Sequence, residues 1–313
     1  MLIDFKCSIN CSINKITIFI LNSLAFKFGF MKNFIVPIDF SVESLNGLKM
    51  AILFSKKTQI SIHLVFVLQK TSESDKQALE SEQKLAEENF KKIIDDFMPQ
   101  LGSNSQLSFI INKGRVYQEV VNLASQIPDS VITASTHGAS GFQELFIGSN
   151  AFRIISATDK PVITLRKNYC PAVIERIVMP IDMSADSRQK VPYTTEVAKL
   201  FGAEIHVVGV HTSRGKQNIK KIRSYVSQVA GYIEGKVHCE INEVFGYDVP
   251  GLIINYCNTV KADLISITTD QASGLSLIMG NTAHQILNKA ELPVLCLTAR
   301  HITKSGSFAS MGG

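Results

Sequence analysis

The residues best suited to hold a phosphate lie in one loop, between a short apolar run and a helical pattern. The small and polar residues of this loop are Ser135, His137, Gly138, Gly148, Ser149 and Asn150. Glycine lets the backbone approach a ligand closely, and the N–H groups at a helix start favour anions. The spacing predicts a phosphate-binding loop; the alternative is an ordinary loop in which Ser149 caps a helix.

Asp39 and Arg115, outside this loop, and His137 within it could contribute to a site. Asp39 follows Pro37 and Ile38 at the end of an apolar run, where it could line a site or merely start a helix. His137 could act as a general base, but no nucleophile or carboxylate is paired with it, which favours a loop-lining role. Arg115 could reach a phosphate, although a solvated loop arginine is the simpler interpretation. The HExxH, GxxxxGK[ST] and GxGxxG patterns are absent, so nothing in the sequence supports fast phosphoryl transfer.

Neither the histidines nor the cysteines indicate a metal site. His206 and His211 lie five residues apart on an expected strand, so their side chains point to opposite faces. The six cysteines are scattered and form no CxxC pair. This pattern is typical of a reduced, cytoplasmic protein with incidental thiols.

The chain repeats itself. Three segments return in the same order: 34–41 as 177–184, 139–142 as 272–275, and 159–165 as 291–297. The second copy is about ten residues shorter in its middle. An ordered repeat of this length predicts two similar domains in tandem.

Within each copy, short apolar runs alternate with helical patterns. The first copy has expected strands at 34–38, 60–68, 107–112, 131–135 and 162–165, and the second at 177–181, 204–210, 238–244, 264–268 and 294–297. Between them, apolar residues step by three and four along 79–97 and 219–233, as on one face of a helix. Alternation of this kind predicts an α/β fold with a parallel sheet covered on both faces. Such sheets bind ligands at the carboxyl ends of their strands, where the strand order reverses.

These motifs resemble the universal stress protein family in its tandem two-domain form. The ATP-binding members carry Gly-x2-Gly-x9-Gly-Ser/Thr after the fourth strand, and Gly138, Gly148 and Ser149 match it, whereas Ser135 replaces the first glycine. The resemblance implies two tandem five-stranded parallel-sheet domains with strand order 3-2-1-4-5 and helices on both faces. We expect domains at 31–167 and 175–298, an extension at 1–30 and a tail at 299–313.

The resemblance also implies a ligand and the residues that hold it. The ligand would be ATP, or AMP or ADP, with or without Mg²⁺. Asp39, after Pro37 and Ile38, and the main chain near Val67 would hold ribose and adenine, and Gly114 would flank the sugar. The phosphates would lie against Gly138, Gly148, Ser149 and Asn150, with Ser135 and His137 lining the loop.

The second copy departs further from the motif. Thr268 stands at the place of Ser135, Gln271 at that of Gly138 and Asn281 at that of Ser149, while Asp182 and Gly246 are retained. A glutamine in a turn with positive φ costs about 1–2 kcal/mol. We therefore expect this copy to be retained structurally and to have a degenerate site.

Charge argues against nucleic acid as a partner. The net charge is +5, but residues 1–30 and 298–313 each contribute two of these charges, which leaves the body almost neutral. The apolar stretch 16–30 is too short to span a bilayer. We expect residues 1–30 to be an extension upstream of the working fold, with an export segment and a short surface helix as alternatives.

The sequence therefore predicts a cytoplasmic stress-response protein that binds an adenine nucleotide in its first domain and acts as a sensor or regulator. We expect no enzymatic activity beyond slow ATP hydrolysis; an enzyme of the wider adenine-nucleotide hydrolase superfamily is a third possibility. The main alternative is a scaffold that binds a protein partner and no nucleotide. The resemblance also implies that strands 162–165 and 294–297 pair, which makes the chain its own pseudo-dimer and leaves a homodimer open.

Overall fold

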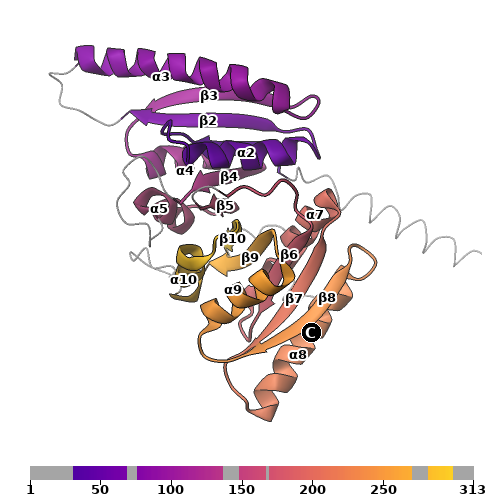
Figure 1. Ribbon diagram of the computed structural model, residues 1–313. Coiled ribbons are helices and arrows are strands. Elements are labelled where there is room, and N and C mark those ends of the chain that lie inside the picture. Colours follow the sequence, from indigo (N-terminus) through magenta and orange to yellow (C-terminus); the bar gives the residue numbers. More distant parts are fainter. Residues whose placement is uncertain (1–30, 69–75, 137–147, 167–168, 270–280, 299–313) are drawn as a thin grey trace, which may run out of the picture.

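The chain folds around one continuous sheet of ten strands (Figure 1). The computed structural model describes residues 31–68, 76–136, 148–166, 169–269 and 281–298. The strands of the first half are β1 (Asn33–Pro37), β2 (Ser61–Leu68), β3 (Gln106–Lys113), β4 (Ser130–Ser135) and β5 (Val162–Leu165). Those of the second half are β6 (Arg176–Ile181), β7 (Glu204–His211), β8 (Cys239–Phe245), β9 (Leu264–Thr269) and β10 (Val294–Thr298).

Helices connect these strands. The first half contains α2 (Ser44–Ser55), α3 (Lys76–Phe97), the short 3-10 helix η2 (Met98–Gln100), α4 (Val116–Gln126) and α5 (Ser149–Ala157). The second half contains α6 (Asp186–Gln189), α7 (Val191–Phe201), α8 (Lys216–Ile233), α9 (Val249–Val260) and α10 (Asn281–Lys289). Every strand expected from an apolar run is present, with its ends within one residue of the prediction.

The sheet order confirms the predicted fold. It reads β3-β2-β1-β4-β5-β10-β9-β6-β7-β8, so that each half has the order 3-2-1-4-5. Neighbouring strands within each half are parallel, whereas β5 and β10 are antiparallel, with Ile163 opposite Leu295. The predicted pairing of the two fifth strands is confirmed, and β3 and β8 are the outer strands.

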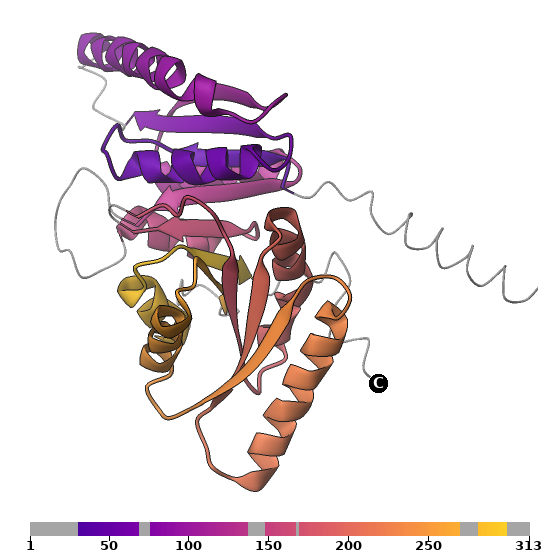
Figure 2. The same ribbon diagram turned by 45° about the vertical axis from the view of Figure 1, so that its right-hand side comes forward.

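An apolar core lies on each face of the sheet. One contains side chains of α2, α3, α7 and α8, and the other those of α4, α5, α9 and α10. Strand residues alternate between the two cores: Phe34 and Val36 point into the first and Ile35 into the second. Figure 2 shows the helices on both faces of the sheet in each half.

Helices also join the two halves beside the strand ladder. The rings of Phe54 on α2 and Phe201 on α7 meet edge to face, with centroids 4.8 Å apart. On the other face, Phe152 of α5 meets the ring of His284 of α10 at 5.4 Å. Both helical layers therefore contribute to the contact between the halves.

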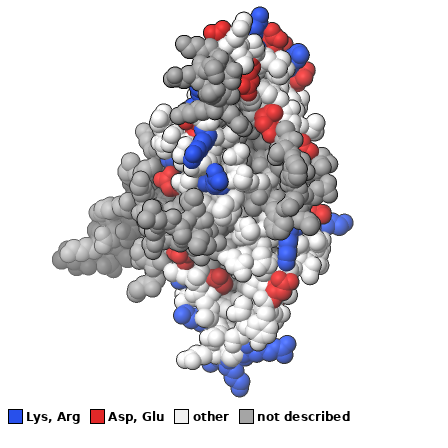
Figure 3. Space-filling model, turned by 90° about the vertical axis from the view of Figure 1, so that its left-hand side faces the viewer, with Lys and Arg blue, Asp and Glu red and all other residues white. Residues whose placement is uncertain are grey.

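The predicted extension 1–30 and tail 299–313 lie outside the described residues. Within the described part of the chain, no helix is both long and apolar enough to cross a membrane. On the face drawn in Figure 3, acidic and basic side chains are interspersed, apart from a small basic group at its lower end.

Candidate functional site

The sheet of the first half opens between β1 and β4. These strands pair only over 33–35 and 130–132, although β1 stays paired with β2 as far as Pro37 and β4 with β5 as far as Ser135. The helix that follows β1 packs on one face of the sheet, and the helix that follows β4 packs on the other. A reversal of this kind leaves a crevice at the carboxyl ends of the strands. Asp39 lies at the β1 side of this crevice.

Asp39 holds the turn that leads into α2. Its Oδ1 accepts hydrogen bonds from the N–H of Ser41, at 3.0 Å, and from the Ser41 hydroxyl. The Ser41 Oγ in turn accepts from the N–H of Ser44, the first residue of α2, at 3.1 Å. Asp39 is nevertheless exposed. The roles of helix start and site residue are therefore compatible in this side chain.

Phe40, directly after Asp39, has a left-handed backbone conformation with φ of 62°. That conformation is uncommon for a bulky residue. The Phe40 ring packs against Phe66 of β2 at 4.9 Å and Phe90 of α3 at 5.0 Å. Core packing therefore fixes the turn, and nothing in the residue pattern marks this conformation in advance.

Gly148 brings the start of α5 against the end of β4. Its N–H donates to the main-chain oxygen of Thr136 at 2.6 Å, and a Cβ here would lie 2.7 Å from that oxygen. Ser149 and Asn150 are the first residues of α5; both are exposed, and Gly148 at the N-cap has no side chain to cap the helix. The first turn of α5 therefore directs N–H groups outward beside the crevice, which favours an anion.

The remaining predicted residues frame the same edge of the sheet. Val67 is buried near the end of β2, and Gly114, directly after β3, donates its N–H to the main-chain oxygen of Leu68 at 3.0 Å. The φ of Gly114 is 157°, beyond the range that a side chain readily allows. His137 and Gly138 lie outside the described residues.

The second half repeats this architecture and contains a cavity of about 450 Å³. There β6 and β9 pair only at residues 177–178. The Oδ1 of Asp182 accepts from the N–H and the hydroxyl of Ser184, at 2.8 and 2.7 Å, as Asp39 does from Ser41. Small-molecule sites have volumes of about 300–1,000 Å³. Residues that line this one include Pro180, Asp182, Lys190, Val210, Thr268 and Asn281.

Of the three residues expected to weaken the site of the second copy, the structure describes Thr268 and Asn281. The Thr268 hydroxyl donates to the main-chain oxygen of Asp186 at 3.1 Å, so it ties the end of β9 to α6 across the crevice. Asn281 begins α10 and lines the cavity. Gln271 lies outside the described residues. Thr268 therefore occupies space that a glycine would leave open.

Lys190 is the cavity residue that sequence reasoning missed. It is 2% exposed, and its Nζ donates to the main-chain oxygen of Ser187 at 2.5 Å. Burial lowers the pKa of Lys190 to about 8, although the negative charge of Asp182 acts in the opposite direction and raises it. Burial would raise the pKa of Asp182, but hydrogen bonds from Ser184 and the charge of Lys190 outweigh it and lower that pKa. Alignment of the two copies could have drawn attention to Lys190, because the first copy has Gly47 at the matching position.

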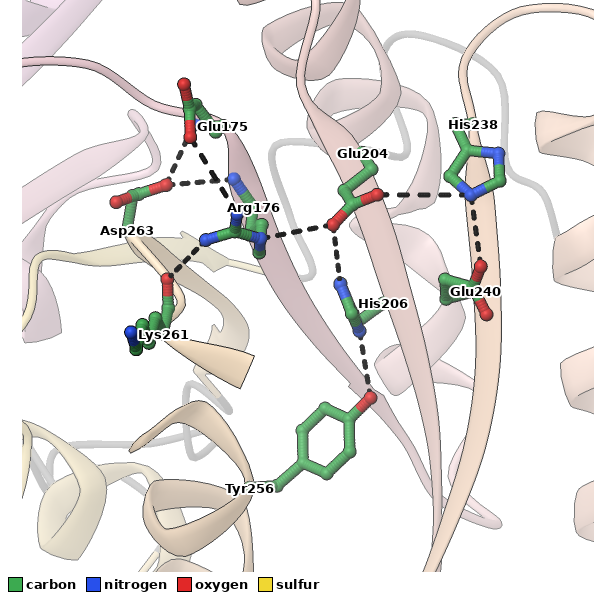
Figure 4. Close-up of polar contacts among 9 residues, drawn as sticks. All are labelled: Glu175, Arg176, Glu204, His206, His238, Glu240, Tyr256, Lys261 and Asp263. Carbon is green, nitrogen blue, oxygen red and sulfur yellow. Dashed lines mark hydrogen bonds and ion pairs between the residues drawn. The ribbon is translucent and has the colours of Figure 1, made fainter. Parts of the chain in front are cut away.

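A second polar cluster lies at the amino-terminal ends of β6, β7 and β8 (Figure 4). Glu204 contacts Arg176 at 3.3 Å, His206 at 3.1 Å and His238 at 3.9 Å. The Nδ1 of His206 contacts the Tyr256 hydroxyl at 2.8 Å. Each of these groups has a polar partner within the cluster, which makes it a network that joins three strand ends.

The two histidines of β7 point to opposite faces, as strand alternation predicts. His206 contacts Tyr256 of α9, whereas His211 contacts Glu243 at 3.1 Å and stacks on Phe245. In the part of the chain that the structure describes, no group of three His, Cys, Asp or Glu side chains could hold a metal ion.

Comparison with known proteins connects both halves to one family. The model of the universal stress protein family matches residues 31–166 and 174–298. A universal stress protein from Archaeoglobus fulgidus DSM 4304 is 20% identical, with a TM-score of 0.70, and covers 86% of this chain and 99% of its own. A protein from Pseudomonas aeruginosa UCBPP-PA14, assigned to the same family, is 20% identical, with a TM-score of 0.60, and covers 90% and 98%.

A shorter universal stress protein from Archaeoglobus fulgidus, solved in complex with dAMP, is 22% identical and covers 40% of this chain and 98% of its own, with a TM-score of 0.33. No match was found among curated proteins.

Proposed function

This chain belongs to the universal stress protein family in its tandem form, and from that premise we propose that its first domain binds ATP or a related adenine nucleotide. The bound nucleotide would bias the shape or the partner surface of the protein, as expected of a stress-response regulator. The protein would act in the cytoplasm.

The opening between β1 and β4 is the observation that carries this proposal. An exposed carboxylate, Asp39, lies at one side of it, and the first turn of α5 lies at the other. In this proposal Asp39 accepts hydrogen bonds from ribose hydroxyls and the main chain near Val67 contacts adenine. The phosphates lie against Gly148, Ser149 and Asn150, where N–H groups and the helix dipole oppose their charge.

The proposed role is regulatory, with slow ATP hydrolysis at most. Asp39 is a poor candidate for a general base, because its Oδ1 already accepts two hydrogen bonds from Ser41. Where ATP carries Mg²⁺, the ion would enter with the phosphates. Binding without turnover suits a sensor, since the occupied state then lasts as long as the nucleotide stays bound.

A scaffold without nucleotide is the second candidate, and Ser135 favours it. This residue, half-buried at the end of β4, stands where the ATP-binding motif has its first glycine. Its side chain would narrow the approach of a phosphate to the backbone. The sheet would then present a partner surface with an empty crevice.

Native mass spectrometry of protein purified from its own source separates these candidates. We expect about one adenine nucleotide per chain, lost in Asp39→Ala and kept in the matched variant Asp182→Ala, because both changes remove the same turn contacts from their own halves. Protein that carries no nucleotide under these conditions would favour the scaffold.

A further inference from the structure

The cavity of the second domain combines apolar walls with one buried ammonium group. Val210, Ile253, Ile267 and Ile286 line it, from β7, α9, β9 and α10. Lys190 and Asp182 are its charged lining residues, and Lys190 is the buried one of the two. A site of this composition suits a small molecule with an apolar body and one polar group.

The hydrogen bonding of Lys190 is incomplete. An ammonium group has three N–H donors, and the Ser187 main-chain oxygen accepts one of them. Among the described residues, Lys190 forms no other hydrogen bond and no ion pair within 4.0 Å. Asp182 is close enough to act on its charge, but the Oδ1 of Asp182 is held by Ser184. Burying a charged donor without full partners is costly.

The first domain shows that the fold does not require a side chain here. At the matching Gly47, a Cβ would lie 2.7 Å from the main-chain oxygen of Thr133, so α2 lies directly on β4. The second domain instead interrupts its helix: α6 ends at Gln189 and α7 starts at Val191, with Lys190 between them. Lys190 keeps a right-handed helical backbone at this junction, and it lines the cavity.

We propose that this cavity binds a small organic carboxylate, whose carboxylate group accepts hydrogen bonds from Lys190 and whose apolar body packs against Ile253 and Ile267. Asp182 already places one negative charge near Lys190. A carboxylate adds one further negative charge, whereas a phosphate monoester adds about two at neutral pH and so leaves more charge without compensation. Asn281, at the start of α10, adds the favourable end of a helix dipole. This inference concerns the second domain and does not depend on nucleotide binding in the first.

Calorimetric titration with benzoate, phenyl phosphate and benzyl alcohol tests the proposal. These probes share one aromatic body and differ in their polar group. We expect benzoate to bind most tightly, and Lys190→Met to weaken it at least tenfold. Lys199→Met, which removes a partly exposed lysine of the following helix α7, should leave it unchanged. Benzoate binding that survives in Lys190→Met, or tighter binding of phenyl phosphate or benzyl alcohol, would overturn the proposal.

A measurement on the unaltered chain covers the case in which Lys190→Met does not fold. The lysine ¹³Cε resonances can be followed by NMR during the benzoate titration, with Lys190→Arg used for assignment. We expect the Lys190 resonance to shift along the calorimetric binding curve. A Lys190 resonance that stays in place while benzoate binds would place the probe elsewhere and reject the assigned site.

Discussion

Asp39 and Asp182 show how one carboxylate can serve a helix and a site together. In each half, the aspartate Oδ1 accepts hydrogen bonds from the N–H and the hydroxyl of a serine two residues on, and that serine's Oγ accepts a backbone N–H from the first turn of the following helix. A side chain fixed in this way keeps its orientation without a ligand. We therefore regard each crevice as preorganised at its aspartate.

The close contact between Gly148 and the main chain of Thr136 can be tested by a single substitution. Gly148→Ala would place a Cβ 2.7 Å from the Thr136 oxygen, so the start of α5 must move. We expect the affinity for ATP to fall about tenfold, or about 1.4 kcal/mol, measured by calorimetry. The control is Gly231→Ala in α8, where a Cβ meets nothing within 4 Å; it should bind ATP normally and be more stable by up to about 1 kcal/mol. Equal affinities of the two variants would contradict this role of Gly148.

The buried charge of Lys190 is expected to destabilise the folded protein. Its pKa falls from 10.5 to about 8 on folding, which corresponds to roughly 3 kcal/mol against the folded state below pH 8. We expect Lys190→Met to raise the free energy of unfolding at pH 7 by roughly 1–3 kcal/mol, measured by denaturant titration.

The pH dependence of that gain has a definite sign. Above about pH 8 the folded lysine becomes neutral, while the unfolded one keeps its proton up to its ordinary pKa, so the wild type gains stability as the pH rises. The advantage of Lys190→Met should therefore shrink between pH 8 and 10. Lys199→Met is the control for charge removal. A gain that is constant with pH would show that Lys190 is not the titrating group.

At the scale of elements, most of the fold could be predicted because it follows from local pattern. Buried parallel strands read as short apolar runs, and the spacing of Ile222, Val226 and Val229 places one face of α8 in the core. The Asp39 turn could be anticipated in part, because aspartate before serine favours a helix start.

Other features depend on tertiary contacts and could not be predicted. The positive φ of Phe40 depends on the rings of Phe66 and Phe90, which lie far along the chain. The burial of Lys190 could not be predicted, because lysine is almost always exposed. The break between α6 and α7 follows from Pro192, which has no N–H to donate and fits the first turn of a helix. The proposed roles of His137 and Gly138 stay predictions, because both residues lie outside the described part of the chain.

The pairing of β5 with β10 can be tested through Ile163. This residue lies between Thr133 of β4 and Leu295 of β10, so proline removes a donor from a strand that is paired on both sides. We expect Ile163→Pro to increase the radius of gyration in small-angle scattering while the helical circular dichroism persists. Ile163→Ala keeps the N–H and should stay compact. An unchanged radius in Ile163→Pro would mean that the helical layers alone hold the halves together.

At the scale of the whole molecule, the two halves share a sheet and both helical layers. The Phe54–Phe201 contact joins α2 to α7 at 4.8 Å. A double-mutant cycle of Phe54→Leu and Phe201→Leu should give a coupling of about 0.5–1.5 kcal/mol, measured from unfolding free energies. Additive losses would show that these rings do not link the stability of the halves.

Both halves repeat the opening of the sheet, but they differ in the chemistry around it. The first retains Gly148 and Ser149 at its helix start, whereas the second carries Thr268, Asn281 and the buried Lys190. We therefore expect only the first half to bind the nucleotide, although both halves have the same strand order.

Calorimetric titration of the full chain with ATP tests this assignment most directly. We predict about one site per chain, lost in Gly138→Gln, which copies the residue of the second half, and kept in the control variant Gln271→Ala, which changes the matching position of the second half. Two equivalent sites, or a single site that survives Gly138→Gln, would contradict the account.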